Sequence, residues 1–157
     1  MPTSKTSYRG LFQVLLRDYQ ALLGYASPTL LPDEGAVSFG GRWGGIAFEL
    51  HHSPITSPQA LFIRCLMGPP PPEHAESVMR RLLSLQRAIA PGLAGALSLE
   101  PRTGDVCFTR ALPLDGLTGA ELLDALGKMR TWAANWRDTY FKDEAGGARP
   151  AAMAALC

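Results

Sequence analysis

The sequence of 157 residues has few of the features that mark specialised classes of protein. Its three cysteines, Cys65, Cys107 and Cys157, are an odd number without CxxC spacing, which favours reduced thiols over a disulfide framework. No stretch approaches the roughly 20 apolar residues that span a bilayer. Gln13 and Arg17 interrupt the first apolar segment before it reaches signal-peptide length. These absences predict a soluble cytoplasmic protein with no membrane partner.

The chain also has almost no excess of charge of one sign. The chain has 15 basic and 14 acidic residues, and no basic run is longer than Arg80-Arg81. A nucleic-acid partner is therefore not expected, because such proteins carry a basic stripe or patch. The length and the 46 % of hydrophobic residues predict one domain with a continuous core, over residues 1–141. Residues 142–157 have no apolar face of useful length and are expected to form a mobile tail.

Catalytic constellations are missing as well. The segment Gly40–Gly45 is rich in glycine but lacks the Lys-Ser/Thr ending of a phosphate-binding loop. His51 and His52 are neighbours on a predicted strand, so their side chains point to opposite faces and do not share a metal. Cys65 has no candidate base, which favours a buried thiol. We therefore predict no enzyme activity, no metal and no cofactor.

The most informative stretch is Leu97–Leu117, because it predicts a β-hairpin that leads directly into a helix. Apolar and polar residues alternate on both sides of the turn-forming segment Pro101–Gly104. Pro113 is expected to end the strand pairing, since proline has no N–H to donate. The chain then enters a long helix with a regular apolar seam.

The remaining elements follow from periodicity and from the positions of glycine and proline. We predict helices over residues 8–23, 73–90 and 118–141, strands over 36–40, 46–51 and 60–67, a turn over 40–45 and a stiff connector over the proline run 69–72. The order is helix, three strands, helix, two strands, helix. This order predicts an α+β fold with an antiparallel sheet, α-β-β-β-α-β-β-α.

Apolar surface exceeds what one small core needs. The first helix has a broad apolar stripe, the strand over 60–67 is apolar on both faces, and Trp43 is expected to be exposed. A twofold-related copy could cover one patch and an extended segment of another protein could cover a second. The alternative is a monomer whose helices cover all of it.

Four segments together resemble a known family. They are LPDEGAVSF, GIAFEL, ALSLEPRTGDVCFTRALPLDGL and WAANWRDTYF, in this order and spacing. The chain resembles the class I chaperones of bacterial type III secretion, the group that includes the chaperone of the intimin receptor Tir. The resemblance implies a cytosolic homodimer without ATPase activity that keeps the N-terminal segment of a secreted effector partly unfolded and secretion-competent. The near-neutral charge, the proline run and the alanine-rich tail depart from the usual pattern of that family.

Two sets of residues are predicted to form binding surfaces. By the resemblance, the effector-binding set lies on the first helix and the strands near it: Phe12, Leu16, Tyr19, Val37, Phe39, Trp43 and Phe48. The apolar faces of the second helix and the late hairpin supply the expected homodimer interface: Val78, Leu82, Leu85, Leu97, Leu99, Val106 and Phe108. Two other functions stay open, a small ligand-binding or enzymatic domain using the groove beside Arg42 and Trp43, and a dimeric adaptor for folded proteins.

Overall fold

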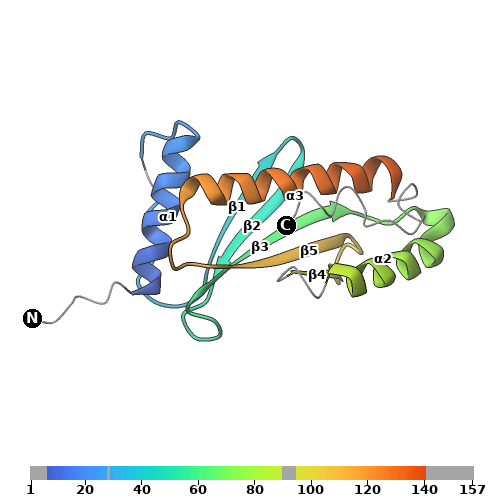
Figure 1. The fold of residues 1–157 in the computed structure, drawn as a ribbon, viewed down its shortest axis with the longest axis horizontal. Helices are drawn as coiled ribbons and strands as arrows, with labels where there is room; N and C mark the ends of the chain where they lie inside the picture. The colour runs from blue at the N-terminus through green and yellow to red at the C-terminus, as the bar shows by residue number, and fades with distance from the viewer. Residues whose placement is uncertain (1–6, 28, 90–94, 141–157) are drawn as a thin grey trace, which may run out of the picture.

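The protein combines three helices with one sheet, as described here by a computed structural model for residues 7–27, 29–89 and 95–140 (Figure 1). In chain order the elements are α1 (Tyr8–Leu22), β1 (Val37–Trp43), β2 (Ile46–His52), β3 (Ala60–Gly68), the short 3-10 helix η1 (Pro72–His74), α2 (Ala75–Ile89), β4 (Gly95–Leu99), β5 (Val106–Pro113) and α3 (Gly119–Thr139). The predicted α+β class and element order are confirmed. The predicted tail over residues 142–157 lies outside the described residues.

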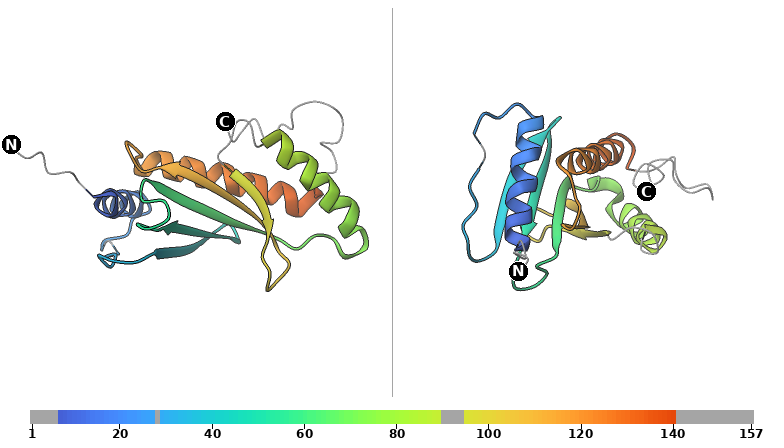
Figure 2. Two further views of the ribbon diagram at one scale, coloured as in Figure 1. Left: turned by 90° about the horizontal axis from the view of Figure 1, so that it is seen from below. Right: turned by 60° about the vertical axis from the view of Figure 1, so that its left-hand side comes forward.

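The sheet has the strand order β1-β2-β3-β5-β4, and every neighbouring pair is antiparallel. Strands β1 to β3 form a meander, and β5 pairs with β3 and with β4 in the late hairpin. Strands β1 and β4 are therefore the two edges. The helices lie to one side of this sheet, with α1 and α2 at opposite ends of the molecule and α3 running between them (Figures 1 and 2).

Strict alternation along the strands decides which residues enter the core. Leu61, Ile63 and Met67 of β3 point toward the helices and are buried, together with Trp132 and Trp136 of α3. The opposite face was expected to be covered too, because it carries Phe62 and Leu66. No described helix covers that face, and these two side chains remain half-buried. The core thus lies between α1, α3 and the helical face of the sheet.

The face of the sheet away from the core, which we call the open face, carries a network of side-chain ion pairs and no described helix. Arg64 of β3 forms ion pairs with Glu49 of β2, at 3.6 Å, and with Glu100 after β4. Its guanidinium also lies 3.7 Å from the Cys107 sulfur. These contacts join three strands on the side away from the core, so the apolar Phe62 and Leu66 are interspersed with charge.

The late hairpin and its entry into α3 follow the prediction. The Glu100 N–H donates to the Asp105 carbonyl and the Gly104 N–H to the Glu100 carbonyl, both at 2.8 Å, which closes the turn over Pro101–Gly104. Strand β5 ends at Pro113. Thr118 then caps α3 in a capping box with Glu121. The backbone and hydroxyl hydrogen bonds from Thr118 lower the pKa of the Glu121 carboxyl.

The glycine-rich segment differs from the prediction. We expected Gly40–Gly45 to turn as a unit, but β1 continues through Trp43 and only Gly44 and Gly45 form the turn. Trp43 pairs with Ile46, and both turn glycines have positive φ, 57° and 78°. A two-residue hairpin turn of this kind needs left-handed backbone at both positions, which two consecutive glycines supply. Trp43 is therefore fixed on a strand and not on a loop.

None of the helices in the described residues is both long enough and apolar enough to cross a membrane.

Candidate binding surfaces

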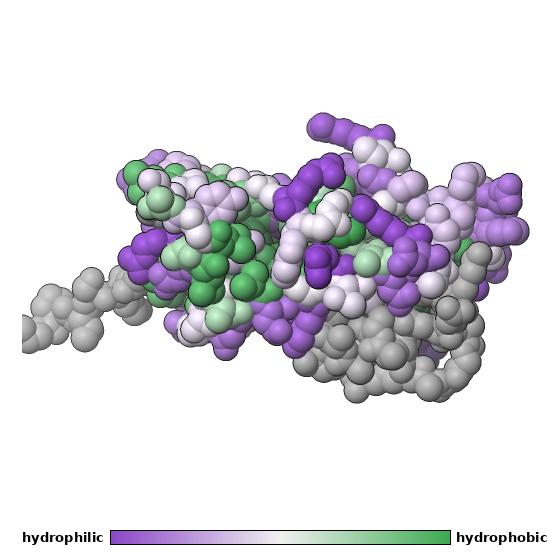
Figure 3. Space-filling model, turned by 90° about the horizontal axis from the view of Figure 1, so that it is seen from above, coloured by the Kyte–Doolittle hydropathy of each residue, from purple (hydrophilic) through white to green (hydrophobic). Residues whose placement is uncertain are grey.

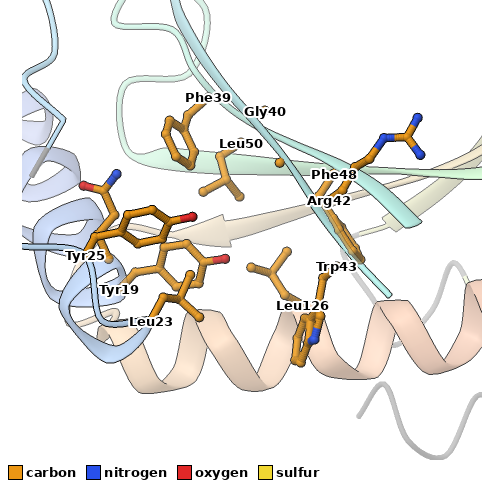
Figure 4. Close-up of a pocket in the computed structure, with 12 residues that line it drawn as sticks. Tyr19, Leu23, Tyr25, Phe39, Gly40, Arg42, Trp43, Phe48, Leu50 and Leu126 are labelled. Carbon is orange, nitrogen blue, oxygen red and sulfur yellow. The ribbon is translucent and has the colours of Figure 1, made fainter. Parts of the chain in front are cut away.

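A hollow of about 120 Å³ lies where the end of α1, strand β1 and α3 meet (Figure 4). Its walls are mainly aromatic and aliphatic, so we name it the aromatic hollow. Its lining residues are Tyr19, Gln20, Leu23, Tyr25, Phe39, Gly40, Gly41, Arg42, Trp43, Phe48, Leu50 and Leu126. Dry engineered cavities of about 150 Å³ accept benzene, so this volume suits roughly one apolar side chain.

The C-terminal end of α1 forms one wall of the aromatic hollow. The helix ends at Leu22, and Gly24 takes a left-handed conformation with φ of 82°. This reverses the chain so that the Tyr25 N–H bonds back to the Gln20 carbonyl at 3.0 Å. Tyr25 and Tyr19 then present their hydroxyls to the same space (Figure 4). Tyr25 keeps 63 % of its surface exposed, so this wall is open to an incoming chain.

Two glutamines of α1 hold the following loop in place. Gln20 accepts a hydrogen bond from the Thr29 N–H at 2.9 Å, and its amide nitrogen lies 2.8 Å from the Thr29 hydroxyl. Gln13 donates to the Thr29 carbonyl and accepts from the Leu31 N–H, both at 2.7 Å. The periodicity of the first helix predicts that both glutamines lie on its polar, solvent-facing side. That interpretation is wrong for Gln20, which is only 4 % exposed.

The opposite wall of the aromatic hollow is built around Trp43. Its ring lies beside Gly127 of α3, where an added Cβ would be 3.5 Å from the indole. The Arg130 guanidinium lies over the indole at 4.6 Å from the ring centroid, a cation–π arrangement. Trp43 is 37 % exposed, which agrees with the expectation of an exposed ring. Helix α3 therefore holds the ring in one orientation and leaves an edge free for contact.

The aromatic hollow combines apolar rings with a hydroxyl group that can form a hydrogen bond. Burial, and to a smaller extent Tyr25, raise the pKa of Tyr19, so its hydroxyl stays neutral and able to donate a hydrogen bond. Rigid aromatic side chains with a polar tip are typical of surfaces that bind peptides, because they contribute area at low entropic cost. The aromatic hollow can thus accept an apolar side chain and bond to a neighbouring polar group.

The structure divides the predicted effector-binding set into two groups. Tyr19, Phe39, Trp43 and Phe48 come together in the aromatic hollow. Phe12, Leu16 and Val37 do not, because their side chains face the core. Phe12 and Leu16 have no exposed surface, so their assignment as contact residues does not fit the structure. Both lie on the broad apolar stripe of α1, whose periodicity alone does not separate core positions from exposed ones.

Sequence reasoning missed several residues of the aromatic hollow. Leu23, Tyr25, Leu50 and Leu126 line it but were not predicted. The available signal was Gly24: a glycine that ends a helix and is followed at once by a tyrosine indicates a reversal that returns the aromatic ring to the helix end. Leu126 belongs to a distant helix, so only the tertiary structure brings it here.

A second apolar depression, of about 280 Å³, lies between α2 and the edge strand β4. We name it the α2–β4 groove. Its lining residues are Met79, Leu82, Leu83, Gln86, Leu97, Ser98, Leu99 and Val106. Gln86 holds β4 against the helix, accepting from the Leu97 N–H at 2.6 Å and donating to the Gly95 carbonyl at 3.3 Å. Gly95 is required there, because a Cβ would lie 2.6 Å from the Phe108 ring.

The predicted dimer-interface residues are also divided by burial. Val78, Leu82, Val106 and Phe108 are buried within the single chain. Leu82 and Val106 line the α2–β4 groove, whereas Val78 and Phe108 do not. The expectation that Val78 and Phe108 contact a second copy directly therefore does not fit the structure. Leu85 and Leu97 are half-buried, and Leu99 is exposed. Leu83, which is 70 % exposed, was not predicted.

His51, His52 and Cys65 occupy structural positions. His51 contacts the Ser38 hydroxyl on the open face, while His52 is buried with its ring 5.5 Å from that of Phe12, so the two point apart as predicted. Burial raises the pKa of the Cys65 thiol to about 12, which makes it a poor nucleophile. Within the described residues, no group of three or more histidine, cysteine or carboxylate side chains is placed to hold a metal.

The class of protein to which this fold belongs follows from the comparison with protein families. The profile of the Tir chaperone protein (CesT) family matches residues 45–137, more than half of the chain. The protein belongs to the Tir chaperone protein (CesT) family. The predicted resemblance is thereby confirmed, and with it the prediction of a type III secretion chaperone at the level of the family. No curated protein matches the sequence significantly.

Solved structures share this fold at low sequence identity. A chain of the HopA1–SchA chaperone–effector complex is 19 % identical, with a TM-score of 0.64 over 83 % of this chain and 96 % of that one. A chain of the ExsC–ExsE complex is 17 % identical, with a TM-score of 0.63 over 82 % and 92 %. A chain of the Yersinia pestis type III secretion chaperone SycH in complex with a YscM2 fragment is 16 % identical, with a TM-score of 0.58 over 79 % and 98 %.

Proposed function

We propose that the protein binds the N-terminal region of a secreted effector in the bacterial cytosol and keeps that region extended and secretion-competent without using ATP. The aromatic hollow supports this proposal most directly. It offers exposed rings on α1 and β1, and β1 is an edge strand whose outer side can pair with an extended chain. Family membership and the chaperone folds of the similar structures fit a binding protein and not an enzyme.

We further propose that two copies associate through the α2–β4 groove. Leu83 and Leu99 are exposed apolar side chains on neighbouring elements, and the groove lies beside the second edge strand. Exposed aliphatic residues at a sheet edge favour aggregation unless a partner covers them. A twofold-related copy presents the same patch and is therefore complementary in chemistry. This placement leaves the aromatic hollow of each copy free, because α1 and α2 lie at opposite ends of the fold (Figure 1).

The effector-binding proposal is tested by co-purification. The tagged protein is purified from its own cytosol, bound proteins are identified by mass, and the effector is then truncated from its N-terminus. We expect Trp43→Glu or Tyr25→Glu to weaken capture strongly, because each apolar contact contributes on the order of 1 to 3 kcal/mol. The circular dichroism spectrum and the oligomeric mass should not change.

Ile55→Glu is the matched control. Ile55 is an exposed apolar residue in the loop between β2 and β3 and does not line the aromatic hollow, so the same substitution there should leave capture intact. If the Trp43→Glu and Tyr25→Glu variants are folded and both still capture the effector fully, the effector binds at a site other than the aromatic hollow. Capture that depends on a folded domain and not on the N-terminal region of the partner would favour an adaptor.

A further inference from the structure

Three arginines gather around the two-residue turn between β1 and β2. Arg42 of β1 and Arg137 of α3 both approach the Gly45 carbonyl, at 3.5 Å and 3.3 Å. Arg130 packs on the other turn residue, since its guanidinium lies 3.1 Å from the position that a Cβ on Gly44 would take. We name these three residues the arginine cluster.

The arginine cluster has no carboxylate partner in the described part of the chain. The ion pairs there involve other basic residues: Arg17 with Asp18, Arg64 with Glu49 and Glu100, Arg80 with Glu76, and Lys128 with Asp124. Within residues 7–27, 29–89 and 95–140, Arg137 donates to two carbonyls, those of Met67 at 2.9 Å and of Gly45. Three guanidiniums around one turn, with no counter-charge from the described residues, create a local positive potential on a nearly neutral protein.

The arginine cluster adjoins the aromatic hollow. Trp43 belongs to the hollow and also carries Arg130 over its ring. Arg42 points away from the tyrosines while the Trp43 side chain points toward α3, so the charge lies just beyond the apolar space (Figure 4). On the face seen from above, apolar surface gathers toward the α1 end and polar surface adjoins it (Figure 3). An apolar residue and a nearby acidic residue of one extended chain would meet these two features in succession.

We propose that the effector segment bound across the β1–β2 turn is acidic as well as apolar, with its carboxylates bound by the arginine cluster and an apolar neighbour in the aromatic hollow. This rests on the proposed function and specifies the chemistry of its client. Guanidinium groups bind carboxylates by paired, charge-assisted hydrogen bonds. The client supplies the counter-charge that the described part of the chain lacks here, and this selects among extended segments of equal hydrophobicity.

The test uses two fluorescent peptides with the same apolar residues, one flanked by glutamates and the other by glutamines. Titration of the full-length protein should show tighter binding of the glutamate peptide, and its advantage should shrink as salt is raised. Arg42→Gln and Arg130→Gln should each reduce the ratio of glutamate-peptide to glutamine-peptide affinity by about threefold, as expected of partly exposed ion pairs. The ratio is the readout because Arg42 lines the aromatic hollow and Arg130 packs on Trp43, so either change also affects the apolar contact that both peptides share. Arg102→Gln, in the exposed β4–β5 turn, is the matched charge control and should change neither.

Two results overturn the proposal. Equal affinity for both peptides, or no binding of the glutamate peptide, removes the acidic preference. A single-stranded oligonucleotide that binds more tightly than the glutamate peptide, and weakens in the same variants, makes the arginine cluster a phosphate site instead. The proposed function stands after either result if the effector still co-purifies and this capture depends on Trp43 and Tyr25. The proposed function itself fails only if that dependence is absent. Arg137 is left unchanged because its bond to the Met67 carbonyl supports the fold.

Discussion

The aromatic hollow and the α2–β4 groove are both apolar, yet they are built from different side chains. The hollow combines aromatic rings with two tyrosine hydroxyls, and an arginine lies at its rim. The groove is aliphatic apart from Gln86 and Ser98, and Gln86 is already bonded to β4. Interfaces between permanent partners are more apolar than the interfaces of transient complexes. The comparison therefore supports the proposal that the groove binds a second copy and that the hollow binds a client that must later be released.

The largest effect should come from a charge placed in the α2–β4 groove. Leu99→Asp would bury a carboxylate without a partner if two copies meet there, at a cost of several kcal/mol. Light scattering at micromolar concentration should then fall from twice 16.9 kDa to 16.9 kDa, while the fold of each copy persists because Leu99 is exposed in the single chain.

Leu30→Asp is the control for this substitution. Leu30 is exposed and lies outside both surfaces, so its variant should keep the mass of the wild type. A wild-type protein that is already monomeric, or a Leu99→Asp variant that keeps the dimeric mass, would place the contact between copies elsewhere and would weaken the distinction between the two regions.

An intermediate effect is expected when the support of the aromatic hollow is removed. Gln20→Ala leaves the Thr29 N–H without its acceptor, which should lower the free energy of unfolding by about 1 to 3 kcal/mol. It should also release the loop that follows Tyr25 and so weaken effector capture, while the dimeric mass is unchanged. Chemical denaturation measures the first effect and co-purification the second.

Gln59→Ala provides the comparison for Gln20→Ala, because Gln59 is exposed. Its variant should unfold at the same denaturant concentration as the wild type. If Gln20→Ala destabilised the dimer and left effector capture intact, the loop would not be part of the client site.

The smallest effect is a dependence on pH. It should differ between the two regions because only the aromatic hollow contains a group whose pKa is raised. The α2–β4 groove has none among its lining residues, so the dimeric mass should not change from neutral pH to about 10, the ordinary tyrosine pKa. The aromatic hollow contains Tyr19, whose raised pKa means that the folded state favours the neutral hydroxyl. The stability that the neutral Tyr19 hydroxyl contributes is present below the ordinary tyrosine pKa and is lost as pH rises through the raised pKa of Tyr19.

Phenolate absorbance and peptide affinity, measured together, check this expectation. Affinity for the glutamine peptide should fall only as Tyr19 ionises, and Tyr19→Phe should reduce that fall. An alkaline loss of the same size in Tyr19→Phe would show that Tyr19 is not the group responsible.

The sequence by itself determined the elements and their order. Alternation fixed β2, β3 and the late hairpin, Thr118 with Glu121 fixed the start of α3, and Gly24 fixed the end of α1, because each of these signals acts over a few residues. Through the resemblance to a family it also grouped Tyr19, Phe39, Trp43 and Phe48 in one predicted binding set with Phe12, Leu16 and Val37. Only the first four line the aromatic hollow.

Only the tertiary structure decided which apolar residues are exposed. Phe12 and Tyr19 share one stripe of α1, but the first packs against His52 and the second opens onto the aromatic hollow. Burial depends on what the sheet and α3 place opposite each turn of the helix, and local periodicity carries no information about that. The same holds for Gln20, which periodicity assigns to solvent and a distant loop buries, and for Arg130 and Arg137, which meet Arg42 only because α3 crosses the β1–β2 turn.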